Sequence, residues 1–415
     1  MIRSRRRVRS LLLLAVVGCA DTVAPVQETP TAITALPRAL TPGEQDIIDA
    51  SGAFAFDLFR EVNKGQWLDR NVFISPLSAS MALGMAMNGA AGTTFDEMRQ
   101  TLGFGTRPLA EINQAYRSLI DVLKGLDPMV KFELANAIWY DTRFGPFVEP
   151  EFLADVRTWF DAEVGPLEMG THQSVTIVND WAKQHTKGKI DDVIQDTEDL
   201  VMLLANAIYF KGDWRDRFDK AATKLELFTT LSGAAIDVPM MNRYGPLRTG
   251  YIGDALVLDQ PYGGDAYSMT VIVPFRESVN DLIERLTADD WRQVIGTLQQ
   301  QNDVPVAFPK LKLQWSDSLK APLQRLGMIT AFLERDADFS RLSAEVGRDL
   351  YISIVKQDTY AEVNEDGTEA AAVTTVGLKP ISLESYRADR PFVFVIRERL
   401  SGAILFMGKI VDPTA

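Results

Sequence analysis

The sequence predicts one large domain of the α+β class, in which helices come first and strands follow. Three observations lead to this prediction. The chain has 415 residues, of which 46% are hydrophobic, enough to bury a substantial core. Apolar residues recur at helical spacing early in the chain, whereas short apolar runs typical of strands dominate the later part. No internal repeat is found, so a repeat architecture is not expected.

The helices of the first half can be justified in chain order. Residues 43–63 place apolar side chains at an approximately helical spacing. Ser78 is expected to cap a second helix, and Ser174 a third that ends near Gly188. The residues at helical spacing are Ile47, Ile48, Phe54, Phe56, Leu58 and Phe59 in the first helix and Val178, Trp181, Ala182 and His185 in the third; in the second, Met81, Ala82, Met85 and Ala86 are the predicted buried face.

Strands and one further helix are expected in the second half. Ser316 or Ser318 is predicted to cap that helix, with Pro322 in its first turns and Gly327 at its end. The runs predicted as strands, several of them apolar enough for sheet centres, are 200–210, 255–260, 267–275 and 350–360.

The N-terminus is predicted to be an export signal. Residues 1–10 carry five arginines, and the apolar run after them is too short to span a bilayer. Val16-Val17-Gly18-Cys19 resembles a bacterial lipobox, so residues 1–18 would be removed and Cys19 lipidated; ordinary cleavage after Ala20 is the alternative. Residues 19–42, rich in Thr, Pro and Ala, would then form a lipid-anchored tether.

Composition limits the partners and the location. Cys19 is the only cysteine, so no disulfide can form within the chain. Without the five arginines of the signal, 38 basic residues remain against 56 acidic ones, a net charge of about −18. Such a surface repels nucleic acid and anionic polysaccharides. We expect an exported monomer of the cell envelope or extracellular space, with no nucleic-acid partner and a membrane contact only through its lipid.

A run of small and β-branched residues, 365–376, points most directly to function. It holds no large apolar side chain and makes poor core, but it fits a pleated sheet. As a strand it would place Thr368, Ala370, Ala372, Thr374 and Val376 on one face, with Gly367 as the pivot. The alternative is an Ala-rich exposed loop or short helix. The residues assigned to this hinge are Glu365, Gly367, Thr368, Glu369, Ala370, Ala371, Ala372 and Val373.

Four blocks in order carry a resemblance to a known family. They are Asn71–Ser78, Asn206–Trp214, Phe308–Leu313 leading to Leu323–Met328, and the segment after the hinge, Tyr386–Arg397 with Ser401–Pro413. Together with the hinge they closely resemble the serpin family over roughly residues 43–413.

The resemblance implies a fold and an activity. The fold would have about eight to nine helices around three β-sheets, with residues 43–415 as the domain and an exposed reactive-centre loop at about 366–386. Its members inhibit serine proteases as suicide substrates: the protease acylates itself on the loop, which then inserts into the central sheet and traps the enzyme. The alternative is a non-inhibitory serpin acting as a surface binding or scaffold protein. The partner would be a target serine protease, held covalently.

Further positions follow from the resemblance. Ser75 and Ser78 match the polar pair where the central sheet opens, Asn206 their hydrogen-bonding partner, and Trp214 the aromatic residue where insertion begins. Glu365 and Lys310 match a salt-bridged pair at the hinge. Gln357 stands where the family often has a histidine; glutamine does not titrate near neutral pH, so opening should depend only weakly on pH.

The reactive bond is predicted at Ile381-Ser382. Counting forward from Gly367 gives this bond, whereas counting backward from Pro391 gives Pro380-Ile381, so the loop is one residue shorter than usual. The length of the inserted arm favours Ile381 as the bait residue. Proline before an apolar bait favours elastase-like or subtilisin-like proteases over trypsin-like ones.

Residues for other chemistry are sparse. The chain has two histidines, His172 and His185, and neither is placed like a catalytic base. Ser353-Ile354-Val355-Lys356 matches a Ser-x-x-Lys motif, but it lies in a predicted strand, where the two side chains would point to opposite faces. The acidic residues Glu362, Glu365, Asp366 and Glu369 match no calcium loop. We therefore expect no enzyme activity, metal or cofactor.

Overall fold

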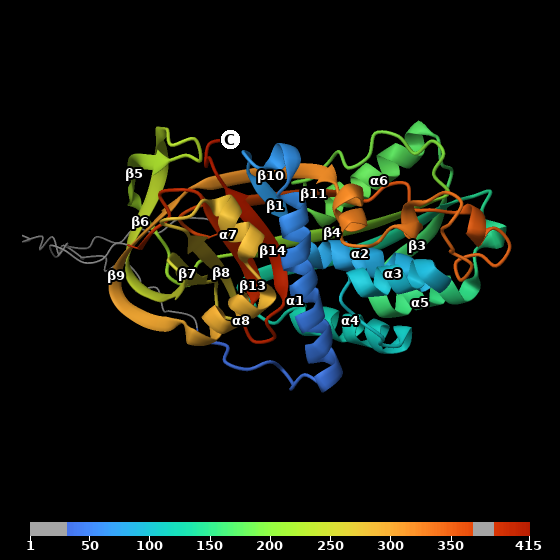
Figure 1. The fold of residues 1–415 in the computed structure, drawn as a ribbon, viewed down its shortest axis with the longest axis horizontal. Helices are drawn as coiled ribbons and strands as arrows, with labels where there is room; N and C mark the ends of the chain where they lie inside the picture. The colour runs from blue at the N-terminus through green and yellow to red at the C-terminus, as the bar shows by residue number, and fades with distance from the viewer. Residues whose placement is uncertain (1–30, 368–385) are drawn as a thin grey trace, which may run out of the picture.

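The computed structural model describes residues 31–367 and 386–415, and within them it shows the predicted mixture of helices and sheets. In Figure 1 the largest sheet occupies the left and centre, α2 to α6 lie to the right, and α1 crosses the middle. The α-helices of the described residues are α1 (Pro42–Val62), α2 (Pro76–Gly89), α3 (Gly92–Thr101), α4 (Leu109–Leu123), α5 (Pro150–Phe160), α6 (His172–His185), α7 (Val279–Arg285), α8 (Ala288–Thr297) and α9 (Lys320–Arg325).

The strands of the described residues form three sheets. The largest has nine strands in the order β1-β14-β13-β8-β7-β6-β9-β12, with β5 paired to β6; a second has the order β3-β2-β4, and a third is the pair β10-β11. Their bounds are β1 Val72–Ile74, β2 Val130–Asp141, β3 Ala162–Leu167, β4 Met202–Gly212, β5 Asp219–Thr229, β6 Ala235–Ile252, β7 Ala255–Pro261, β8 Tyr267–Val273, β9 Gln299–Pro309, β10 Leu311–Ser318, β11 Lys356–Val363, β12 Tyr386–Arg387, β13 Phe392–Glu398 and β14 Ile404–Ile410.

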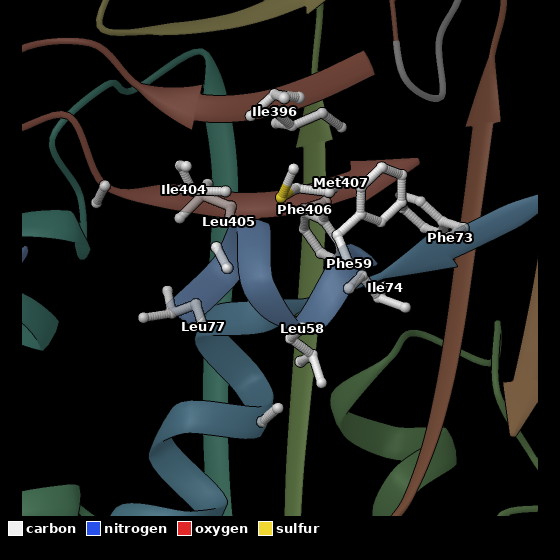
Figure 2. Packing of buried hydrophobic residues seen from close by; sticks show 14 of the residues in the cluster. Leu58, Phe59, Phe73, Ile74, Leu77, Ile396, Ile404, Leu405, Phe406 and Met407 are labelled. Carbon is white, nitrogen blue, oxygen red and sulfur yellow. The ribbon is translucent and has the colours of Figure 1, made fainter. Parts of the chain in front are cut away.

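The core joins the early helices to the last strands of the chain. Figure 2 shows Leu58, Phe59 and Leu77 from α1 and α2 packed against residues 404–407 of β14. Phe73 stacks on Phe406 with ring centroids 5.2 Å apart. Helix α2 is buried on nearly every side, and its apolar residues surround the helix instead of forming a stripe. It is therefore a central helix between layers of strands.

The predicted capping residues were wrong by one to three positions. Helix α2 is capped by Ser75, whose Oγ accepts the Ser78 amide at 3.3 Å, and α6 is capped by Thr171, which accepts the Ser174 amide at 3.1 Å. Both predicted serines occupy the third helical position, because each helix extends one turn further back than its apolar pattern. Helix α9 follows Leu319, which offers no side-chain cap, although Ser318 Oγ accepts the Lys320 amide at 3.3 Å.

Three of the four predicted strand runs are present as β4, β7 and β8. The fourth was predicted over 350–360, but β11 begins only at Lys356, and 350–355 has no regular structure. A strand needs a hydrogen-bonded neighbour, and none pairs with 350–355 in the described residues. These residues instead border a cavity. The apolar residues of 350–355 are typical of a strand, but a local sequence pattern does not tell whether a partner strand is present.

The described part of the predicted tether, residues 31–41, lies against the domain. The Ile33 amide donates to the Gly264 carbonyl at 2.6 Å, and Arg38 forms an ion pair with Glu44 at 2.8 Å. Cys19 and the signal lie outside the described residues. Within residues 31–367 and 386–415, no helix combines the length and apolar character needed to cross a bilayer.

Candidate functional site

Two sheet edges face each other without pairing. In the described residues β4 is the last strand of the three-stranded sheet and β11 is the free edge of the β10-β11 pair. A cavity of about 770 Å³ lies between them, bounded by 201–208 on one side and 349–359 on the other. We call this opening the seam. Its floor is formed by the N-cap residue Ser75 and by one face of α2, where all residues but one are small: Ser78, Ala79, Ala82, Leu83 and Ala86.

A polar cluster lies beside the seam floor. The Ser75 amide donates to Gln357 Oε1 at 2.9 Å, and Gln357 Nε2 donates back to the Ser75 carbonyl at 2.8 Å. Ser75 Oγ donates to the Leu405 carbonyl at 2.8 Å. The structure thus places the first turn of α2 against the start of β11 through two reciprocal hydrogen bonds, with both side chains buried.

Asn206 lies across the seam from that cluster. Its Nδ2 donates to Asn136 Oδ1 on β2 at 2.6 Å, while its own Oδ1 is buried without a partner in the described residues. A buried acceptor without a donor is costly. Of the four polar residues predicted here, Ser75, Ser78 and Gln357 form one hydrogen-bonded cluster. Asn206 lies on the opposite side of the seam and bonds to Asn136 instead.

The chain leaves β11 in a tight turn of residues 364–367, which we call the hinge turn. The Asn364 amide donates to the Gly367 carbonyl at 2.8 Å, and Gly367 also forms an antiparallel bridge with Asp213, just past the end of β4. Trp214 supports the turn: its amide donates to the Asp366 carbonyl at 2.8 Å and its indole Nε1 to the Asn364 carbonyl at 2.9 Å.

Only glycine fits at position 367. Its φ is +149°, and a Cβ there would lie 2.2 Å from the Gly212 carbonyl oxygen. That separation is far inside van der Waals contact. The pivot predicted at Gly367 therefore coincides with the closest backbone approach of the hinge turn.

The hinge turn is held by charged side chains that are themselves buried. Glu365 pairs with Lys310 Nζ at 3.0 Å and accepts the Thr223 hydroxyl at 2.8 Å. Burial opposes the ionised form of Glu365, but hydrogen bonds from its own backbone amide, Thr223 and Lys310 outweigh burial, so its pKa is lowered. Asp366 pairs with Lys220 Nζ at 2.5 Å.

The far end of the predicted loop is fixed to the large sheet. Tyr386 and Arg387 form β12, which pairs in parallel with β9, and Arg387 also forms an ion pair with Glu226 on β5. The hinge residues Thr368, Glu369, Ala370, Ala371, Ala372 and Val373 and the reactive-bond residues Pro380, Ile381 and Ser382 lie outside the described residues. Their assignments stay predictions.

The residues considered for other chemistry are dispersed. His185 lies 3.2 Å from Glu163 and against the Trp181 ring, and His172 begins α6. Ser353 lies in the irregular segment 350–355 and not, as predicted, in a strand; Lys356 begins β11, so the pair still shares no helix face. Among the residues that the structure describes, no three His, Cys, Asp or Glu side chains are grouped to hold a metal.

Sequence reasoning missed four residues that complete the site. Asn136 holds Asn206, Asn364 closes the hinge turn, and Thr223 and Lys220 hold its two acidic side chains. Lys220 and Thr223 lie on β5, far from the hinge in sequence. The exposed β5 pattern gives no sign that two of its polar side chains face residues 365 and 366.

Comparison with known proteins agrees with this architecture. Residues 49–413 match the family model of the serpins, described as serine protease inhibitors. The leukocyte elastase inhibitor of Sus scrofa is 33% identical over 383 residues, covering 88% of this chain and 98% of the relative. The chain belongs to the serpin family.

Solved structures show the same fold. The thermophilic serpin Tengpin in its native state superposes with a TM-score of 0.80 at 28% identity, covering 93% of this chain and 97% of that one. A thyroxine-binding globulin in complex with thyroxine gives a TM-score of 0.79, also at 28% identity, covering 89% of this chain and 100% of that one. The predicted family and fold class are thereby confirmed.

Proposed function

We propose that this chain inhibits serine endopeptidases as a suicide substrate and that the seam receives the loop once it is cut. The seam is the observation that carries the proposal. Among the residues that the structure describes, the edges of β4 and β11 are unpaired and face an opening of about 770 Å³, with mostly small side chains on its floor. An unpaired edge is a template for a further strand. Residues 368–376, which follow the hinge turn, have the small and β-branched composition of such a strand.

The trapping step can be written as bond changes. The serine hydroxyl of the protease attacks the carbonyl carbon of Ile381, and the bond to Ser382 breaks. The amino group of Ser382 takes the proton and leaves, and an ester joins Ile381 to the protease. Entry of the freed arm into the seam would carry the acylated protease along and distort its catalytic site, so that the ester is not hydrolysed.

The target class follows from the bait sequence. Ile381 is apolar and follows Pro380, which favours the pockets of elastase-like or subtilisin-like proteases. The name of the relative from Sus scrofa, a leukocyte elastase inhibitor, supports the first of these classes. A cut at Pro380-Ile381 is the alternative.

Mixing the mature chain with pancreatic elastase and with subtilisin tests the proposal. We expect an adduct that survives denaturing electrophoresis and, by mass spectrometry, a released fragment that begins at Ser382. A fragment beginning at Ile381 would move the bait to Pro380. Complete cleavage of the chain while the protease keeps its activity would refute inhibition and favour a non-inhibitory binding or scaffold role, as the thyroxine complex of a solved relative illustrates.

We also propose that the protein is exported as a monomer and anchored through a lipid on Cys19. The supporting observation is the lipobox-like sequence before the only cysteine. Expression in bacteria with a radioactive fatty acid should label the native chain but not a Cys19→Ala variant. Label in both chains, or in neither, would contradict the anchor.

A further inference from the structure

The hinge turn lies just past the ends of β4 and β11, where a strand entering the seam would begin. Gly367 is bridged on both sides, antiparallel to Asn364 on the β11 side and antiparallel to Asp213 on the β4 side. These are the two strands that an incoming strand would join. The structure therefore holds one residue of that strand in place before any bond is cut.

Asp366 is a charged residue of this turn that is nevertheless buried. It is 3% exposed, and its carboxylate lies 2.5 Å from Lys220 Nζ and 4.0 Å from Arg217, which itself pairs with Asp213 at 2.8 Å. A buried carboxylate is costly unless a cation compensates it. The Lys220 side chain reaches it from β5, outside both sheets that border the seam.

We propose that Lys220 is a positioning residue for the hinge turn, holding Asp366 so that Gly367 stays between β4 and β11. Its consequence for trapping rests on the proposed function. Insertion competes with hydrolysis of the acyl bond, so a turn that is already in place shortens the time before trapping. Without Lys220 the turn would open more often, and more of the chain would be cleaved without capturing protease.

Hydrogen exchange on the uncut mature chain tests the positioning role without any protease. The amides to follow are those of Trp214 and Gly367, which donate to Asp366 and Asn364. In Lys220→Met both should exchange about three- to tenfold faster, while Lys220→Arg should restore most of the protection. The matched control is Lys224→Met, which removes a lysine of the same strand paired with Glu226.

The same variants are then mixed with elastase, and the ratio of trapped to cleaved chain is measured. We expect this ratio to fall about three- to tenfold in Lys220→Met and to stay unchanged in Lys224→Met. Unchanged exchange at Trp214 and Gly367 would overturn the proposal, whatever the trapping ratio. Faster exchange in a protein whose native form traps no protease would support the positioning role while the inhibitory function fails. If Lys220→Met does not fold, Asp366→Asn removes the same charge pair and is judged by the same two amides.

Discussion

At the scale of single residues, the hinge turn leaves no room for a side chain at position 367. Gly367 lies where a Cβ would overlap the Gly212 carbonyl, and the acidic residues before it are buried against two lysines. Of these, the sequence indicated Gly367, and the family resemblance indicated Glu365 and Lys310. Lys220 and Thr223 could not be predicted, because a contact between β5 and residue 365 or 366 depends on tertiary packing.

Replacing Gly367 with alanine should break the hinge turn. The added methyl group cannot fit beside Gly212, so Trp214 should lose its two hydrogen bonds to the turn. We expect a loss of about 1–3 kcal/mol in unfolding free energy and a lower trapped fraction, measured by denaturant titration and elastase assay. Gly52→Ala, in α1 with open space around it, is the control and should keep full trapping.

Lys409 makes stability depend on alkaline pH. It is fully buried, and burial lowers its pKa to about 8, although its Nζ donates to the carbonyls of Trp67 and Leu68. The unfolded chain binds this proton more tightly, so stability should rise from about pH 8 to pH 10.5, by about 2–3 kcal/mol. Urea unfolding across this range should show the rise in native protein and in Lys131→Met, but not in Lys409→Met. An equal rise in all three would rule out Lys409 as its source.

At the scale of elements, the seam depends on the small residues of α2. Because the serine and alanine side chains of α2 are short, they leave space between β4 and β11 that a larger side chain would fill. The periodicity of the sequence predicted α2, β4, β7 and β8, because each buries an apolar pattern typical of its type. It placed two helix starts three residues late and extended β11 backward, because caps and strand partners are set by neighbours that a local pattern does not contain.

Ala82→Phe should separate folding from trapping. The ring would occupy part of the seam, so the native chain should fold with nearly unchanged or slightly higher stability while strand entry is slowed. We expect a trapped-to-cleaved ratio at least tenfold lower, on the order of 1.4 kcal/mol in the competing barriers. Ala110→Phe, on the exposed side of α4, serves as the control. Full trapping by Ala82→Phe would mean that the seam is not the route of insertion.

At the scale of the whole molecule, the opening between β4 and β11, which are sheet edges among the described residues, implies that the native fold has not reached its full stability. Filling it with a strand would pair two free edges and cover apolar surface, so the cut protein should be more stable than the intact one.

Limited proteolysis within 368–385 should therefore raise the unfolding temperature by on the order of 20 °C, measured by calorimetry. Cutting in the segment before residue 31 provides the comparison and should leave the unfolding temperature as it was. A cut loop that lowers the temperature, or leaves it in place, would argue for a fold without stored free energy.

The two fixed ends of the loop also limit how far an uncut chain can enter the seam. Gly367 is fixed beside Asp213 and Tyr386 beside Val306, with the 18 residues 368–385 between them. Each residue that enters the seam lengthens the inserted strand by about 3.3 Å. It also removes one residue, about 3.5 Å of reach, from the segment that must return to Tyr386. Even if the two anchors lay side by side, an uncut chain could therefore descend by at most about nine residues before it is taut, unless β12 separates from β9. Cutting the chain would remove this limit at once, so in the proposed mechanism the bond that the protease attacks is also the restraint on the strand.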